Sequence, residues 1–231
     1  MSKLRLKFNK TDNMIYISHL DMMRVIQRAM KRAHLRVEYS QGFNPHALMS
    51  FSTAVPLGLT INNEYMDISM EENISPEEYI QRINPCLPKG LKMIDGKEID
   101  EKEKPIMGQI RWGSYLICIN TKNSDSIIEK IDLFLNRESI TYIKEKKKKK
   151  RWMRREVEIR PLIESIDVFV NESDFLVLKV MIRTGSEGNL KPEKMMELMK
   201  NLEEIDVILE DIKYQRLDLF LENDDEKIKP I

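Results

Sequence analysis

Apolar and polar residues alternate along several short stretches of the chain, and stretches with helical spacing separate them. Leu4, Leu6 and Phe8 alternate with basic residues, which predicts a first strand with one buried face. Residues 18–35 contain no Gly or Pro, and their apolar positions recur at helical spacing. Further strands are predicted within residues 36–40, 48–55, 64–70 and 91–94, with a second helix opening at Ser75–Pro76. The first half therefore reads strand, helix, strands, helix, strand.

The same order of elements returns in the second half. Strands are predicted within residues 111–120, 140–143, 175–182 and 208–221, with helices at 124–136 and after 191. The helix-opening pattern Asn-[Ile/Leu]-x-Pro-Glu occurs at residues 73–77 and again at 189–193. Its recurrence at the same place in the element order indicates an internal duplication.

The predicted fold class is α+β. We expect two ferredoxin-like units, each with the order β-α-β-β-α-β, an antiparallel sheet and helices on one face. The predicted division is an N-terminal unit at residues 1–95, a charged linker at 96–110, and a C-terminal unit at 111–231.

The helix at residues 18–35 has a capped start and a basic outer face. Ser18 and Asp21 fit the capping-box pattern, in which the serine hydroxyl accepts from the amide three residues on. The basic residues that share the face opposite the apolar stripe are Arg24, Arg28, Lys31 and Arg32. This ridge is either a solvated surface or a phosphate-binding surface, for which arginine is well suited.

Two histidines near this helix are candidate functional residues. His19 falls on the apolar side of the first turn, where the helix N-terminus is expected to lower its pKa. It is either a structural imidazole or a neutral general base. Gly42 and Pro45 explain the loop at residues 41–46 as a shaped turn, but they do not explain its Phe43 or His46. The loop is therefore a candidate site.

The segment 144–155 reads KEKKKKKRWMRR and cannot pack as a core strand. We expect it to project as a hairpin or loop, either simply solvated or as a phosphate-contacting arm in which Trp152 stacks. The candidate nucleic-acid-binding residues are Arg24, Arg28, Lys31, Arg32, Lys146, Lys147, Lys148, Lys149, Lys150, Arg151, Trp152, Arg154 and Arg155.

Composition narrows the function classes. The formal net charge is zero, but residues 144–160 carry ten Lys or Arg against three Asp or Glu, so charge is segregated. The two cysteines, Cys86 and Cys118, sit in no metal or redox pattern, so we expect no metal or cofactor and a reducing, cytoplasmic setting. A metal site built from His19, His46 and Asp21 is a weak alternative. No signal peptide or membrane-spanning run is expected.

Several strings resemble one bacterial family. They are Ile17–Asp21 (ISHLD), Gly42–His46 (GFNPH), Pro56–Gly58 with Glu64, Arg160–Ile163 and Gly188–Pro192. The chain resembles radical-SAM-associated proteins, a domain of unknown function that occurs free or at the C-terminus of cobalamin-binding radical SAM chains. The resemblance implies a bacterial protein whose partner holds the iron–sulfur cluster, since this chain has no C-x-x-x-C-x-x-C motif. The motif residues that form a candidate partner site are Ser18, His19, Asp21, Gly42, Phe43, Asn44, Pro45, His46 and Glu64.

Three functions follow from these observations. The leading hypothesis is a non-catalytic RNA-binding or substrate-presenting module for a radical SAM modifying enzyme. The second is a protein–protein adaptor that uses the polar loop and binds no nucleic acid. The third resembles the metal-independent endoribonucleases of CRISPR systems, with His19 or His46 as base and acid. No reaction is identified by the sequence, so catalysis is an open question.

Overall fold

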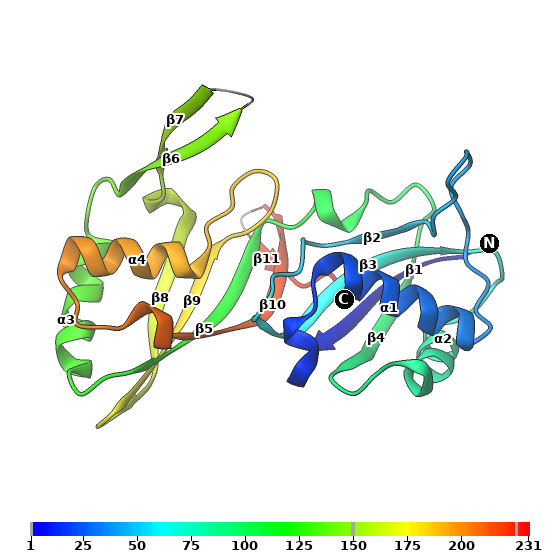
Figure 1. Cartoon of the computed structure of the whole chain (residues 1–231), viewed down its shortest axis with the longest axis horizontal. Helices are drawn as coiled ribbons and strands as arrows, with labels where there is room; N and C mark the ends of the chain where they lie inside the picture. The colour runs from blue at the N-terminus through cyan, green and yellow to red at the C-terminus, as the bar shows by residue number, and fades with distance from the viewer. Residues whose placement is uncertain (1, 149–150, 225) are drawn as a thin grey trace. The chain divides into compact units, whose positions relative to one another are not determined.

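The structure, a computed structural model, describes residues 2–148, 151–224 and 226–231 (Figure 1). It is a mixed α+β protein in which strand pairing is mostly antiparallel. The chain forms two compact units, one of residues 1–113, 185–187 and 215–231, the other of residues 114–184 and 188–214. The first unit thus includes the end of the chain, unlike the predicted consecutive units.

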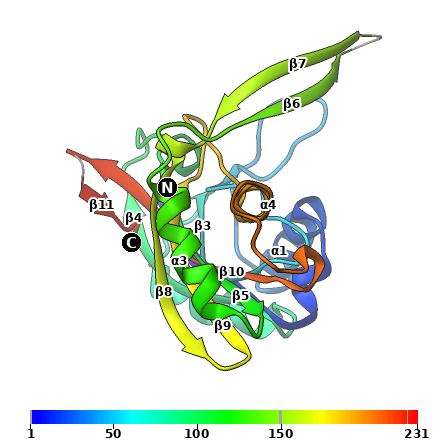
Figure 2. The same cartoon turned by 90° about the vertical axis from the view of Figure 1, so that its left-hand side faces the viewer.

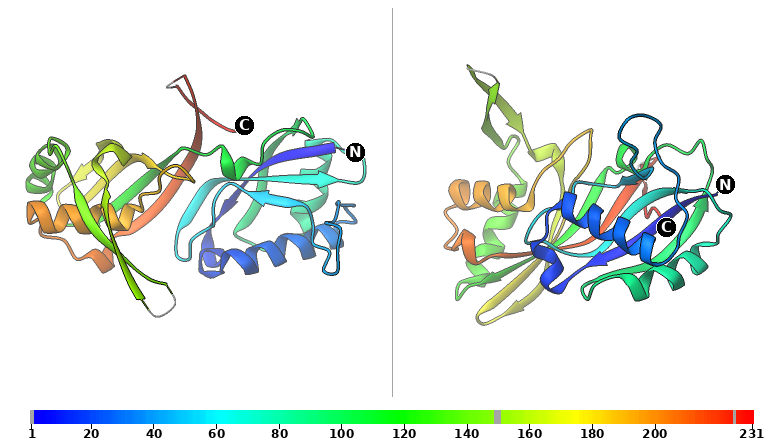
Figure 3. Two further views of the ribbon diagram at one scale, coloured as in Figure 1. Left: turned by 90° about the horizontal axis from the view of Figure 1, so that it is seen from above. Right: turned by 45° about the vertical axis from the view of Figure 1, so that its right-hand side comes forward.

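The first unit contains two helices and most of its strands in one sheet. The elements are β1 (Ser2–Lys10), α1 (His19–Arg32), β2 (Met49–Phe51), β3 (Thr60–Met70), α2 (Pro76–Ile83), β4 (Leu91–Ile99), β10 (Lys213–Asn223), whose first two residues belong to the second unit, and β11 (Glu226–Ile228). β1 pairs antiparallel with both β3 and β4, and β2 pairs with β3. Figure 3 shows α1 running along one face of β1 and β3.

Local signals explain where the helices begin. The Ser18 hydroxyl accepts from the Asp21 amide at 3.1 Å, which confirms the predicted cap of α1. α2 begins at Pro76 and α4 at Pro192, as the repeated motif predicts. The apolar stripe of α1, with Met22, Ile26 and Met30, is buried with the alternating apolar side chains of β1.

The second unit has the strand order β5-β9-β8 with two helices that contact each other (Figure 2). Its elements are β5 (Trp112–Asn120), whose first two residues belong to the first unit, α3 (Ser124–Leu135), β6 (Thr141–Lys148), β7 (Arg151–Glu158), β8 (Ile163–Glu172), β9 (Phe175–Arg183) and α4 (Pro192–Glu203). β6 and β7 pair only with each other among the residues described, and this two-stranded ribbon extends away from the rest of the unit (Figures 1 and 2).

Four segments differ from the predictions made from the sequence. Residues 163–172, where no strand was predicted, form β8. The strand expected at residues 36–40 is reduced to isolated bridges at Val37 and Tyr39. The strand expected at 48–55 ends at Phe51, because the next two side chains turn to the carboxylate of Glu64. The predicted linker is part of the fold: β4 runs through Ile99, and Ile106 and Ile110 are fully buried with Tyr65 and Leu219.

Candidate functional site

A buried polar cluster lies where the pairing of β1 and β3 shifts register, between Phe8 and Lys10. Such irregularities often lie beside functional sites. The cluster draws residues from β1, the start of α1, the segment after β2, β3 and β10. Its members are Lys10, His19, Ser52, Thr53, Glu64 and Arg216.

Glu64 and Arg216 form the centre of the cluster. Their side chains are 0% and 2% exposed and make an ion pair through Nη2 of the arginine. Glu64 also accepts hydrogen bonds from the Ser52 and Thr53 hydroxyls, and the guanidinium donates to Thr53 Oγ1 at 3.0 Å. Burial lowers the pKa of Arg216 to about 9, although Asp218 nearby acts in the opposite direction. The Nε atom of Arg216 is buried and makes no hydrogen bond in the described part of the chain.

Lys10 fixes the backbone around the cluster. Its ammonium group donates to the carbonyl oxygens of Ile15, Ile17 and Pro56 at 3.1, 3.2 and 2.9 Å. These three acceptors match the three donors of an ammonium group. Burial, together with the positive charge of Arg216, lowers the pKa of Lys10 to about 8. Lys10 therefore joins β1 to the residues before α1 and to the segment after β2.

His19 is half-buried and held by the same segment. Its Nδ1 accepts from the Val55 amide at 3.4 Å, and its ring meets Phe51 edge-on at a centroid distance of 5.1 Å. The pKa of His19 is lowered, first by burial and then by the charge of Lys10. The pKa is lowered, as predicted from the sequence. Its causes, however, are burial and Lys10, a neighbour that sequence reasoning missed.

His46 has different partners. Its Nδ1 lies 2.8 Å from the Ser40 hydroxyl, which also accepts from the His46 amide. These contacts close the loop at residues 40–46, where Gly42 has a φ of 131° and every residue from 41 to 46 is exposed. Phe43 at the tip is fully exposed. Of the predicted motif residues, His19 and Glu64 thus belong to the buried cluster, Ser18 and Asp21 form the cap of α1, and residues 42–46 lie in the exposed loop.

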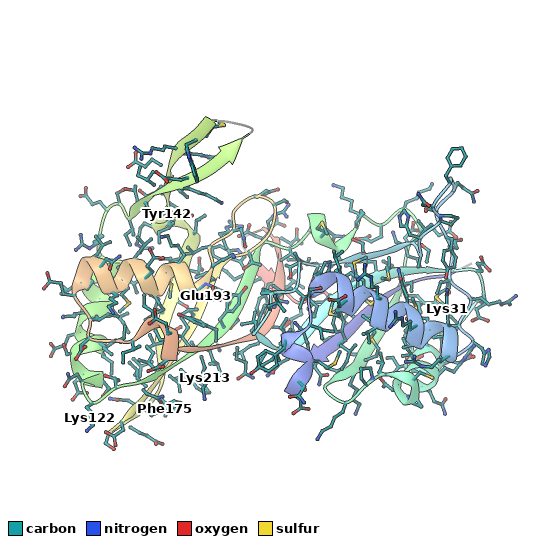
Figure 4. The ribbon with its side chains drawn as sticks, viewed as in Figure 1. Lys31, Lys122, Tyr142, Phe175, Glu193 and Lys213 are labelled. Atoms are coloured by element: carbon teal, nitrogen blue, oxygen red, sulfur yellow. The ribbon has the colours of Figure 1, made fainter. Side chains whose placement is uncertain are left out.

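The basic ridge of α1 is exposed as the helical spacing predicts. Arg24 donates to Asp21 at 2.9 Å, and Arg32 donates to the Cys86 carbonyl at 2.6 Å. Hydrogen bonds from Ser18 and Arg24 lower the pKa of Asp21. Figure 4 labels Lys31 near the end of α1.

The basic arm forms the ribbon β6–β7, apart from Lys149 and Lys150, which lie outside the described residues. The pairing sets Lys144 opposite Arg155, Glu145 opposite Arg154, and Lys148 opposite Arg151. Arg154 donates to Glu145 at 2.7 Å, and Trp152 is 65% exposed. The side chains of Lys146, Lys147, Lys148 and Arg151 also lie outside the description, and the register gives only the positions of these residues along the two strands.

Glu158 holds the base of the ribbon. Its carboxylate accepts from the Ser139 hydroxyl, from the Ile140 amide at 2.8 Å and from the Arg160 amide at 2.9 Å. Burial acts to raise the pKa of Glu158, but these hydrogen bonds outweigh it and the pKa is lowered. Lys194 of α4 also lies over the ring of Tyr142, 4.6 Å from its centroid, where Figure 4 labels this tyrosine at the start of the ribbon. These contacts join the base of the ribbon to α4 and to the segments on either side of it.

Sequence reasoning missed Lys10, Ser52, Thr53 and Arg216. Only Lys10 carried a local signal, because it continues the alternation of Leu4, Leu6 and Phe8 onto the buried face. Within the described residues, no three His, Cys, Asp or Glu side chains come together in a way that could hold a metal ion. The same residues contain no helix with the length and apolarity needed to cross a membrane.

Comparisons with known proteins identify a family and no activity. The sequence model of the family described as "Uncharacterized protein conserved in bacteria (DUF2344)" matches residues 3–192. No curated protein matches the chain.

Two solved structures show only distant likeness. One is a Cbf5-Nop10-Gar1 complex, with 9% identity and a TM-score of 0.49 over 94% of this chain and 48% of that chain, so the chain spans about half of it. The other is a putative glycine cleavage system transcriptional repressor, with 11% identity and a TM-score of 0.25 over 96% and 98% of the two chains.

Lys10 gives the first unit a distinct pH dependence. Its folded pKa of about 8 lies below its usual value of 10.5, so between these values the unfolded chain holds more protons at this site. Its contribution to the free energy of unfolding therefore rises with pH across this window. In urea denaturation, the stability of the wild type relative to Lys10→Met is expected to increase from about pH 8 upward. Parallel pH profiles would contradict this; the exposed Lys92→Met is the control.

Replacing Glu158 with Gln is expected to loosen the base of the ribbon, because a neutral amide accepts more weakly than a carboxylate. The Ile140 amide, and the Ile159 amide that donates to the Ile140 carbonyl at 2.8 Å, should exchange hydrogen faster by NMR, whereas Glu156→Gln on the same strand should change neither. Since the folded pKa of Glu158 is lowered, its contribution is complete above about pH 4.5 and is lost as the pH falls through the folded pKa. Equal exchange rates in wild type and Glu158→Gln would remove Glu158 from this role.

Proposed function

The chain belongs to the bacterial family described as uncharacterized and conserved, as its motifs predict, and we propose that it is an RNA-binding module that presents RNA to a separate modifying enzyme. The observation that carries the proposal is the ribbon β6–β7. It places like charges opposite each other, Lys144 with Arg155 and Lys148 with Arg151. Such pairs are destabilising in an antiparallel ladder.

In its described part, the ribbon lacks a hydrophobic core of its own, which favours a polyanionic partner. A two-stranded ribbon is marginally stable on its own, and opposed cations weaken it further. Exposed side chains such as Met153 and Ile143 supply little core. A nucleic-acid backbone would relieve the repulsion between the cations and release its own counterions, which makes binding favourable. The hydrogen bonds that Glu158 accepts hold the base of the ribbon together.

The ridge of α1 provides a second set of exposed cations in the first unit. Three of the four residues are arginines, which make bidentate contacts with phosphate. Arg32 donates to a backbone carbonyl, which holds its side chain in place, whereas the charge of Arg24 is partly neutralised by Asp21. The ridge is proposed as an additional phosphate contact.

The modifying enzyme proposed as the partner is a radical SAM protein. The support is the resemblance of the ISHLD and GFNPH strings to radical-SAM-associated proteins, together with the chain's own cysteines. Cys86 and Cys118 are far apart in sequence and both are free thiols. The iron–sulfur cluster of the radical SAM enzyme would therefore reside on the partner, while this chain would bind and position RNA.

We also propose that the two units arose by duplication of a ferredoxin-like β-α-β-β-α-β unit. In each unit the first strand neighbours the third, and the second neighbours the third on its other side, as β1-β3-β2 and β5-β9-β8. The second helix of each starts at the repeated motif, with Ile74 and Leu190 both buried before the proline. The ribbon then occupies an insertion between α3 and β8.

A second candidate function is protein docking through the loop at residues 40–46, and the exposure of Phe43 favours it. A fully exposed aromatic ring on a loop closed by Ser40 and His46 is a suitable anchor for a pocket on a partner. In this function the loop would act independently of RNA.

RNA binding is tested with total cellular RNA across a salt series. Wild type is expected to bind with steep salt dependence, because each phosphate contact releases counterions. A variant with Gln at residues 146, 148 and 151 should bind more weakly and show a shallower dependence. Absence of binding at low salt, or identical binding by the variant, would contradict the proposal.

The docking function is tested by pull-down of a radical SAM protein encoded in the same organism, after nuclease treatment. Phe43→Ala is expected to lower retention about tenfold, since truncating a central anchor typically costs more than 1 kcal/mol. Phe43→Tyr keeps the ring and is the matched control. Retention that disappears with nuclease would show that RNA, not the loop, joins the two proteins.

A further inference from the structure

The two faces of the ribbon β6–β7 differ in charge. This difference follows from the register in which the two strands pair. Directly opposed residues of an antiparallel pair share a face, and successive residues alternate between faces. The pairing of Thr141–Lys148 with Arg151–Glu158 continues without a shift from one end to the other. Every position in the ribbon can therefore be assigned to one of two faces.

One face carries basic positions and no acidic ones. We call it the acid-free face, and beyond its base it consists of positions 144, 146, 148, 151, 153 and 155. Five of these are Lys or Arg, and the sixth is Met153. At the base of the same face, Tyr142 and Val157 are half-buried, and Tyr142 is covered by Lys194. The exposed part of the face thus begins at Lys144 and Arg155.

The other face is charge-balanced. It consists of positions 143, 145, 147, 152, 154 and 156, with two basic and two acidic residues among them. Arg154 is already paired with Glu145 at 2.7 Å. Ile143 and Trp152 are 57% and 65% exposed on this face. A phosphate approaching here would meet two carboxylates and an arginine whose charge is partly neutralised.

Folding of the ribbon does not require its acidic residues to be confined to one face. Glu145 and Glu156 have opposite parity in the sequence, yet the register brings them to one face. Placing either acid opposite a lysine on the other face would have reduced repulsion between the strands. The arrangement instead concentrates repulsion on the acid-free face, which is the arrangement a polyanion would stabilise.

From this separation we propose that the ribbon binds RNA through its acid-free face alone, with Lys144 and Arg155 as phosphate contacts. The proposal rests on the RNA-binding function proposed above and identifies the surface that carries it. It also assigns Trp152 a place away from the phosphates, because its position lies on the charge-balanced face. The expected ligand is the sugar–phosphate backbone of RNA, bound with little dependence on base sequence.

The test compares two double variants that each remove two positive charges from the same ribbon. Lys144→Gln with Arg155→Gln alters the acid-free face, and Lys147→Gln with Arg154→Gln alters the other. The probes are a fluorescein-labelled poly(U) oligomer and an RNA hairpin, titrated with the full chain over a salt series. Circular dichroism and thermal melting check that both variants fold.

Lys144→Gln with Arg155→Gln is expected to reduce the magnitude of the slope of log affinity against log salt by about 1.4 on poly(U), at about 0.7 per lost contact. This corresponds to roughly 25-fold weaker binding at about 0.1 M salt. Lys147→Gln with Arg154→Gln should retain the wild-type slope. Equal losses in the two variants would overturn the face assignment and leave the RNA-binding function standing, whereas absence of binding by the wild type would overturn both.

Two charge insertions give an independent readout. Met153→Glu places a carboxylate on the acid-free face and is expected to weaken poly(U) binding about fivefold at about 0.1 M salt, as for one lost contact. Ile143→Glu places one on the charge-balanced face and should leave binding near the wild-type level. Poly-glutamate is the competitor that tests the ligand class: if it displaces poly(U) at equal charge concentration, the surface is a general polyanion site and the RNA assignment is wrong.

Discussion

The buried ion pair between Glu64 and Arg216 is the interaction on which the first unit depends. It joins β3 to β10 across 152 positions of sequence. Removing one partner of a buried pair leaves an uncompensated charge, which typically costs about 3–5 kcal/mol. The same carboxylate holds the Ser52 and Thr53 hydroxyls, and the segment that follows them contacts Lys10 and His19. The position of the motif histidine is therefore set by a contact with the last long strand of the chain.

Local rules were sufficient for the elements whose signals are local. The cap at Ser18, the proline starts of α2 and α4, and the apolar stripe of α1 all follow from residues within a few positions of one another. The buried cluster could not be found in this way, because its partners meet only after β1, β3 and β10 pair. Arg216 sits on a strand with leucines at 217, 219 and 221, so alternation alone would place it on the solvated face, and yet it is buried.

The predicted linker illustrates a related limit. Its charge suggested exposure, and most of its charged side chains are indeed exposed. Ile106 and Ile110 within it are nevertheless fully buried, and the Ile106 amide donates to Asp67 at 2.9 Å. Asp67 in turn pairs with Arg5 at 2.8 Å, so the segment covers a buried ion pair of the sheet. Average composition hides this role, since a few apolar side chains decide whether a charged segment packs.

The net charge of the chain is zero, but its charged groups have different roles. Several carboxylates are engaged inside the units: Glu64 by Arg216, Asp67 by Arg5, Glu203 by Arg137, and Glu158 by the ribbon base. Each of these carboxylates is held by partners close to it, so its charge contributes to folding. Lys144 and Arg155 are exposed and face each other without an acidic residue on their side of the ribbon. The field that a polyanion meets at this surface is therefore set by the register of the two strands, and the sum over the whole sequence does not describe it.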